Sequence, residues 1–223
     1  TLASVVDYLS SQSYRAEVIV VDDGSTDGTA EMVRQGPSSS VPLRLHTHPD
    51  RANHGKGAAV RLGILEGRGQ YRLFMDADNS TTIDHIERFW LSFEQGYDVV
   101  ICSRSIQGAY VAVHQAWYKE SAGRAGNYLI RTLAVPGIMD TQAGFKMFTR
   151  RSAEDLFPRL TVDRWGFDVE VLAVARARGY RIKEMPITWI NAIGSKVSFG
   201  SYFQVLGEVW RVRRNLKAGR YSY

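Results

Sequence analysis

Cysteine is almost missing from this sequence of 223 residues, which contains only Cys102. A lone thiol cannot form a disulfide within the chain, and a zinc site built from cysteines is excluded. Cys102 follows the apolar run Val99–Ile101, which predicts a buried strand position. Long apolar stretches are missing too, since none approaches the ~18 residues of a membrane span. No signal peptide is visible.

Several motifs of familiar enzyme classes are also absent. The histidines show no H-E-x-x-H or similar metal spacing, and neither G-x-S-x-G nor a G-x-G-x-x-G after a strand occurs. The segment Asn53–Val60 resembles part of a phosphate loop, but Asp50 and Gly57 stand where a Walker A motif needs glycine and Ser/Thr. These absences argue against zinc proteases, α/β-hydrolases and P-loop enzymes.

The residues that are present suit one folded domain. The chain is 44% hydrophobic and 23% charged, which is enough for a full core. Apolar strand patterns alternate with helical ones, which predicts an α/β fold with a mainly parallel, Rossmann-like sheet and helices on both faces. We expect a catalytic domain over residues 1–200 and an amphipathic basic helix over 201–223. The net charge of +5 suits an anionic ligand or a membrane surface, but is no nucleic-acid signature.

Two carboxylates mark the end of the apolar run Tyr71–Met75. Because side chains alternate along a strand, Asp76 and Asp78 lie on one side of the backbone. Ligands of open α/β sheets bind beyond the strand ends. Paired carboxylates there suit Mg²⁺ or Mn²⁺ held together with a substrate's phosphates. The alternative is an acidic loop in which Asp78 caps the helix near Ile83.

A second acidic turn follows the apolar strand Glu17–Val21. Asp22 and Asp23 open a glycine-containing turn before a helix, where the base and ribose of a nucleotide are commonly held. The alternative is an aspartate cap beside a turn glycine. Lys56 lies at the start of the next predicted helix, where it can meet a phosphate.

The last predicted helix carries an apolar stripe beside a basic end. Its apolar face contains Val205, Val209, Val212 and Leu216, and its basic residues are Arg211, Arg213, Arg214 and Lys217. This pattern suits a helix lying on anionic headgroups. The alternative is that the stripe packs on the domain and that the arginines are solvated.

Taken together, these motifs resemble a known enzyme family. Val21–Asp27, Asn53–Gly57 and Asp76–Asp78 resemble the inverting family-2 nucleotide-sugar glycosyltransferases of the GT-A fold. Within that family the chain is most similar to the polyprenyl- or dolichyl-phosphate sugar transferases. The narrower resemblance rests on further segments, which are Ser103–Arg104, Asp140–Lys146, Trp165–Glu170 and Gly194–Val197.

The resemblance implies a role for each candidate residue. Nucleotide-binding residues would be Asp22, Asp23, Ser25, Lys56 and Asp76. Asp76 and Asp78 would hold Mg²⁺ or Mn²⁺, and Asp78, Asp140 and Asp168 would be catalytic. The acceptor phosphate would be bound by Arg104, Lys119, Ser121, Arg124 and Lys196. Glu170 would lie with Asp168 on a helix that lines the site.

Some features depart from the family pattern. The family's first strand is not found ahead of Thr1, so we expect it upstream. Ser80 replaces a metal-contacting Gln of the mannosyl branch, and Asp140–Gln142 and Phe167–Glu170 favour the glucosyl branch. Thr161 precedes Arg164–Trp165 where processive synthases carry Gln, which disfavours polymer synthesis.

The expected function is metal-dependent, inverting transfer of a hexose to a polyprenyl or dolichyl phosphate on the cytoplasmic face of a membrane. UDP-glucose is the expected donor, with GDP-mannose and UDP-GlcNAc as alternatives. A second alternative is transfer to a sugar or protein hydroxyl, with Asp140 or Asp168 as base. The third is an inactive nucleotide- or membrane-binding module.

Overall fold

The computed structural model describes residues 1–111, 130, 132–189 and 199–221. Its largest sheet has the strand order β3-β6-β4-β7. These strands are β3 (Tyr71–Met75), β6 (Phe145–Thr149), β4 (Val99–Ser103) and β7 (Ile182–Pro186). Two parallel pairs complete the described strands, β1 (Val18–Asp22) with β2 (Leu43–Thr47) and β5 (Tyr110–Val111) with β8 (Thr188–Trp189). The predicted α/β class is confirmed. Within the main sheet β4 and β7 are parallel, whereas β6 runs antiparallel to both of its neighbours.

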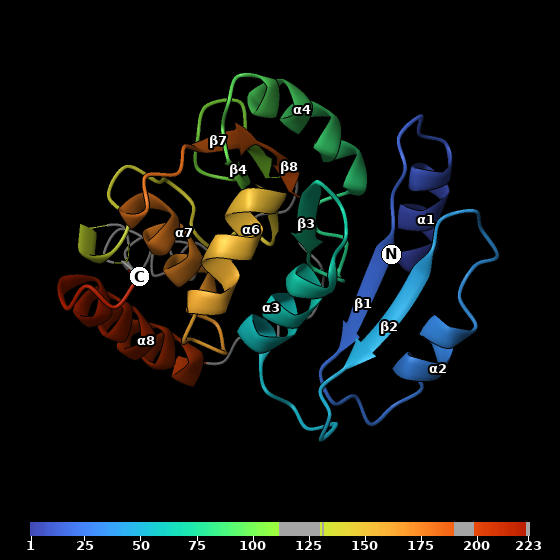
Figure 1. Cartoon of the computed structure of the whole chain (residues 1–223), viewed down its shortest axis with the longest axis horizontal. Coiled ribbons are helices and arrows are strands. Elements are labelled where there is room, and N and C mark those ends of the chain that lie inside the picture. The colour runs from blue at the N-terminus through green and yellow to red at the C-terminus, as the bar shows by residue number, and fades with distance from the viewer. Residues whose placement is uncertain (112–129, 131, 190–198, 222–223) are drawn as a thin grey trace.

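Helices cover both faces of the main sheet (Figure 1). The described helices are α1 (Leu2–Ser10), α2 (Thr29–Arg34), α3 (Lys56–Glu66), α4 (Glu87–Glu94), α6 (Arg150–Leu156), α7 (Phe167–Ala177) and α8 (Phe199–Lys217), of which α2 lies against β1 and β2. Short 3₁₀ turns, η1 (Ile83–Ile86) and η2 (Phe157–Arg159), precede α4 and follow α6. α3 contacts both β1 and β3, so it joins the β1–β2 pair to the main sheet. The expected upstream strand stays a prediction.

Alternation along the central strands builds two cores. Val99, Ile101 and Phe148 belong to the cluster under α3, α6, α7 and α8. Val100 and Cys102 face the opposite way, into the cluster that includes Phe89 of α4. Both faces of β4 are therefore buried, which is why its sequence is continuously apolar. Cys102 is buried as predicted, and its burial raises the pKa of the thiol.

The final helix packs on the domain. Val205, Val209 and Val212 are buried in the same core cluster as Val169 of α7. Of the two alternatives for this helix, inward packing of the stripe is therefore correct, and the stripe does not face a membrane. In the described ranges, no helix is both long enough and apolar enough to cross a bilayer.

Candidate active site

The end of β3 places Asp76 against the turn that enters β6. The Asp76 amide donates to the carbonyl of Gly144 at 2.9 Å. Gly144 also makes room for the carboxylate, because a Cβ built there would lie 1.9 Å from Asp76 Oδ2. Lys56 Nζ is 2.7 Å from Asp76 Oδ1. The strand end, the glycine and the lysine together fix this carboxylate.

The first turn of α3, which we call the lysine turn, presents Lys56. Gly55 precedes it with a φ of 101°, a conformation that favours glycine. The Asp23 carboxylate accepts hydrogen bonds from the backbone amides of His54 and Gly55, each at 2.8 Å. Asp23 therefore ties the turn after β1 to the start of α3, and this bond to the lysine turn was not foreseen from the sequence.

The rest of the acidic turn after β1 is also hydrogen-bonded internally. Asp22 Oδ1 accepts from the backbone amide of Ser25 at 2.9 Å, and Asp22 is buried while Ser25 is exposed. Of the three predicted residues Asp22, Asp23 and Ser25, Asp23 contacts the start of α3 directly. Their contacts with a nucleoside stay predictions.

Asp78 shapes the turn that follows β3. Its Oδ1 accepts from the backbone amide of Ser80 at 2.9 Å, and Asn79 adopts a φ of 60°. η1 begins after Thr82 without a side-chain cap, so the alternative in which Asp78 caps this helix is wrong. In the described part of the chain, the second oxygens of Asp76 and Asp78 have no hydrogen-bond partner.

This pair of carboxylates fits one kind of metal site. Within the described ranges, no group of three or more histidine, cysteine or acidic side chains could hold a metal ion. A hard divalent ion commonly takes only one or two carboxylates and completes its shell with water and substrate phosphates. The donor set of Asp76 and Asp78 therefore suits Mg²⁺ or Mn²⁺ bound together with a diphosphate.

Half-buried Arg104 and buried Asp140 form an ion pair with two hydrogen bonds. Arg104 Nε lies 2.7 Å from Asp140 Oδ2 and Nη2 lies 3.0 Å from Oδ1. Burial alone would raise the pKa of Asp140, but the Arg104 guanidinium outweighs it and holds that pKa below its ordinary value. Glu184 of β7 accepts from the backbone amides of Met139 and Asp140 and so fixes the loop.

A second ion pair, which is buried, joins β6 to α7. Lys146 is fully buried, and its Nζ lies 2.5 Å from Asp168 Oδ1 and 2.6 Å from the Ala143 carbonyl. Its ammonium also lies 5.3 Å from the centre of the Phe74 ring. The sequence predicts no role for Lys146, the last residue of the segment Asp140–Lys146. A lysine between Phe145 and Met147 in an apolar strand was the signal for a buried partner.

These groups share one electrostatic field. Burial alone would lower the pKa of Lys56, but Asp168, Asp76 and Asp78 outweigh it and raise that pKa. Arg104 is likewise held charged, by Asp140 first and then by Asp168 and Asp76. The structure thus brings together Lys56, Asp76, Asp78, Arg104, Asp140 and Asp168 from the predicted set.

Other predicted residues lie elsewhere. The carboxylate of Glu170 bonds to Thr161, Val162 and Tyr221, so it holds a loop and does not line this site. Four predicted acceptor residues lie outside the described residues, namely Lys119, Ser121, Arg124 and Lys196. Of the acceptor set, Arg104 alone is described.

Comparison with known proteins gives a consistent picture. The sequence profile described as "Glycosyl transferase family 2" matches residues 1–157. The chain is 34% identical to a dolichyl-phosphate beta-glucosyltransferase of Dictyostelium discoideum, covering 95% of the chain and 68% of that protein. It is 33% identical to the Homo sapiens protein of the same name, covering 93% and 66%. The chain thus spans about two thirds of the length of these relatives.

Solved structures show the same fold at low sequence identity. Mannosyl-3-phosphoglycerate synthase from Rubrobacter xylanophilus has a TM-score of 0.67 at 17% identity, covering 99% of the chain and 71% of that structure. Glucosyl-3-phosphoglycerate synthase from Mycobacterium tuberculosis, in complex with Mn²⁺, UDP-glucose and phosphoglyceric acid, has a TM-score of 0.66 at 16% identity, covering 96% and 75%. These likenesses establish a GT-A-like architecture.

Proposed function

Because the chain belongs to glycosyl transferase family 2 and is a glycosyltransferase, we propose that it transfers glucose from UDP-glucose to a dolichyl or polyprenyl phosphate. The transfer would invert the anomeric centre. The names of its curated relatives support glucose and dolichyl phosphate. The segments Asp140–Gln142 and Phe167–Glu170 also favour the glucosyl branch.

One observation carries the choice of a phosphate acceptor. The two carboxylates considered as general bases, Asp140 and Asp168, are both buried and ion-paired with Arg104 and Lys146. A base must reach the acceptor proton and hold it, and a buried carboxylate neutralised by a cation is poorly suited to that task. A phosphate monoester has lost most of its second proton at neutral pH, with a pKa of ~6 for phosphoserine. Such an acceptor attacks without a base.

The donor diphosphate would bind where Lys56 meets Asp76 and Asp78. A divalent ion held by these two carboxylates would supply charge stabilisation for the leaving nucleoside diphosphate. The Asp76 carboxylate and the diphosphate would compete for the Lys56 ammonium, so Lys56 would shift from Asp76 toward the diphosphate. Asp22 and Asp23, which anchor the neighbouring turns, would lie next to the nucleoside.

The acceptor phosphate would approach Arg104 from the side that Asp140 does not contact. Nε and Nη2 of Arg104 are engaged by Asp140, whereas Nη1 makes no hydrogen bond with the described residues. The guanidinium also stacks 5.2 Å from the Trp189 ring centre and is 32% exposed. Asp140 would thus orient Arg104 so that one N–H edge faces the acceptor.

Membrane association is the remaining part of the proposal. With the stripe of α8 buried, its outer face presents Trp210, Arg214 and Lys217, all exposed. A tryptophan beside two cations suits an anionic headgroup layer. The cytoplasmic face of a membrane is where we expect this contact.

Radiolabelled sugar transfer to polyprenyl phosphate tests the proposal. UDP-glucose, GDP-mannose and UDP-GlcNAc would each be supplied with Mg²⁺ and with Mn²⁺, and the lipid product would be extracted. We expect label in the lipid with UDP-glucose and none in excess EDTA. Transfer to free sugars with no lipid product would replace the proposal with the hydroxyl-acceptor alternative. UDP binding without transfer to any acceptor would indicate an inactive module.

A further inference from the structure

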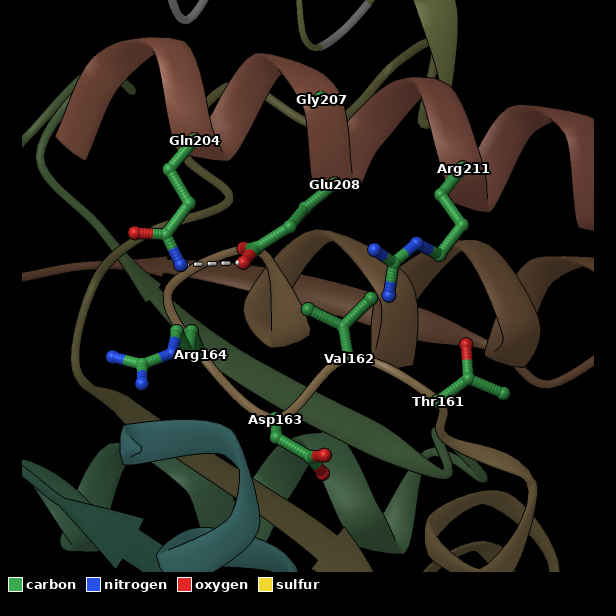
Figure 2. Close-up of a pocket in the computed structure, with 8 residues that line it drawn as sticks. All are labelled: Thr161, Val162, Asp163, Arg164, Gln204, Gly207, Glu208 and Arg211. Carbon is green, nitrogen blue, oxygen red and sulfur yellow. Dashed lines mark hydrogen bonds between the residues drawn. The ribbon is translucent and has the colours of Figure 1, made fainter. Parts of the chain in front are cut away.

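A buried network connects the turn after α8 to the loop between η2 and α7. We call residues 160–166 the bridging loop. It lies between α8 and the start of α3, and Figure 2 shows α8 on one side of it. A pocket of ≈ 460 Å³ lies on this α8 side, lined by Thr161, Val162, Gln204, Glu208 and Arg211 among others. The bridging loop is thus in a position to relay changes from α8 to the active site.

Two buried carboxylates hold the α8 side of the bridging loop. Glu170 is fully buried and accepts from the Thr161 amide, the Thr161 hydroxyl, the Val162 amide and the Tyr221 hydroxyl. Among the described residues Glu170 has no cationic partner, so these donors alone stabilise its charge. Glu208 of α8 accepts from the Gly166 amide at 2.6 Å. Both carboxylates therefore anchor loop backbone.

The opposite side of the bridging loop presses on the lysine turn. The Asp163 carbonyl accepts from the Ala58 amide at 3.0 Å. A Cβ at Gly55 would lie 2.7 Å from that same carbonyl, and one at Gly57 would lie 2.6 Å from the Val162 carbonyl. Arg61 also binds Asp163 at 2.7 Å. Because the two backbones are in such close contact, a displacement of the bridging loop would move the first turn of α3.

We propose that Tyr221 and Glu170 are positioning residues for Lys56, acting through the bridging loop. This inference rests on the proposed function in one respect, namely that Lys56 binds the donor diphosphate. Tyr221 is buried, donates to Glu170 at 2.7 Å and accepts from Asn215 at 3.2 Å. Losing its hydroxyl leaves one lone pair of a buried carboxylate unmatched. The Glu170 carboxylate then bonds more closely to the amides of Thr161 and Val162, and the bridging loop shifts away from α3.

Conservative variants test this relay. Tyr221→Phe removes the hydroxyl, and Thr161→Ala removes a second donor from Glu170 at an exposed position where misfolding is not expected. Thr161→Ser keeps the hydroxyl and should restore wild-type behaviour. The matched control is Tyr8→Phe, because Tyr8 also donates to a glutamate, Glu87, but on the far side of the main sheet.

Two measurements separate positioning from stability alone. Calorimetry with UDP and Mn²⁺ should show affinity reduced about three- to tenfold in Tyr221→Phe and Thr161→Ala, because only part of the loss of one hydrogen bond to a charged group is passed on to Lys56. Hydrogen exchange of the Ala58 amide should quicken in the same variants. Thr161→Ser and Tyr8→Phe should change neither quantity.

The outcomes are distinct. Unchanged exchange at Ala58 in both Tyr221→Phe and Thr161→Ala overturns the relay, whatever happens to thermal stability. Should Tyr221→Phe fail to fold, Thr161→Ala against Thr161→Ser decides alone. If the wild-type protein does not bind UDP, the proposed donor is wrong, and the exchange data still decide the inference.

Discussion

Replacing Lys146 with methionine should test the buried pair beneath the active site most directly. Methionine nearly matches the length and volume of the lysine side chain, so no large cavity results. The change leaves the Asp168 carboxylate, only 4% exposed, without its cation. Removing one partner of a buried pair costs about 3–5 kcal/mol. The orphaned Ala143 carbonyl adds about 1–3 kcal/mol. Since domains are stable by only about 5–15 kcal/mol, Lys146→Met should be marginally folded.

A double variant separates the charge from the packing. Lys146→Met combined with Asp168→Leu replaces the pair with apolar groups, which is often neutral or stabilising. Urea unfolding near neutral pH should therefore show most of the lost free energy of unfolding restored. Turnover should stay low, because Asp168 is the largest source of the negative potential that keeps Lys56 charged.

A Lys146→Met protein within about 1 kcal/mol of wild type, less than the cost of a broken buried pair, would refute the reasoning.

Three further outcomes are expected. Asp78→Asn should abolish turnover with an unchanged circular dichroism spectrum, and full activity in that variant would contradict its role as a ligand. Gly144→Ala should displace the Asp76 carboxylate, given the 1.9 Å approach, and calorimetry should find Mn²⁺-dependent UDP binding lost while UDP alone binds as before. Vesicle flotation should show binding to anionic but not neutral lipid, reduced when Arg214 and Lys217 become glutamine, and equal binding by that variant would count against the α8 face.

The pH dependence of activity follows from the depressed pKa of Asp140. A carboxyl whose folded pKa lies below its unfolded value stabilises the fold above that unfolded value, and the contribution is lost as pH falls through the folded value. Asp140 therefore remains ionised through the mildly acidic range. Activity should decline only as the acceptor phosphate gains a proton, at ~6 by analogy with phosphoserine. An unaltered acid limb in Asp140→Asn, measured on whatever activity remains, would agree with this.

Local patterns were readable from the sequence, and pairings between distant segments were not. Strand β3 was predicted to the residue because a mostly apolar run ends sharply at Asp76. The antiparallel insertion of β6 between β3 and β4 leaves no trace in local periodicity. Asp76 and Asp78 follow β3 directly, and their role as metal ligands stays a prediction.

The ion-pair partners of the charged residues could not be predicted either, because they lie far apart in the sequence. Arg104 and Asp140 were assigned separate tasks, yet they bind each other across 36 residues of sequence. Whether a helix stripe meets lipid or a neighbouring helix also depends on the tertiary fold. The resemblance supplied the candidate site residues, and only the structure gave their contacts.

Charge balance supports the proposal that a divalent ion binds at this site. The predicted site residues that the structure brings together, with Lys146, comprise three cations, Lys56, Arg104 and Lys146, and four carboxylates, Asp76, Asp78, Asp140 and Asp168. Three positive charges against four negative ones give this set a net charge of about −1. A nucleoside diphosphate and a phosphate acceptor would both meet repulsion there. A divalent ion on Asp76 and Asp78 would reverse the sign of this charge, while the ion pairs of Arg104 and Lys146 keep both remaining carboxylates occupied. Residues that offer no competent base would thus also create the need for a metal, which is the combination expected when the acceptor is itself an anion.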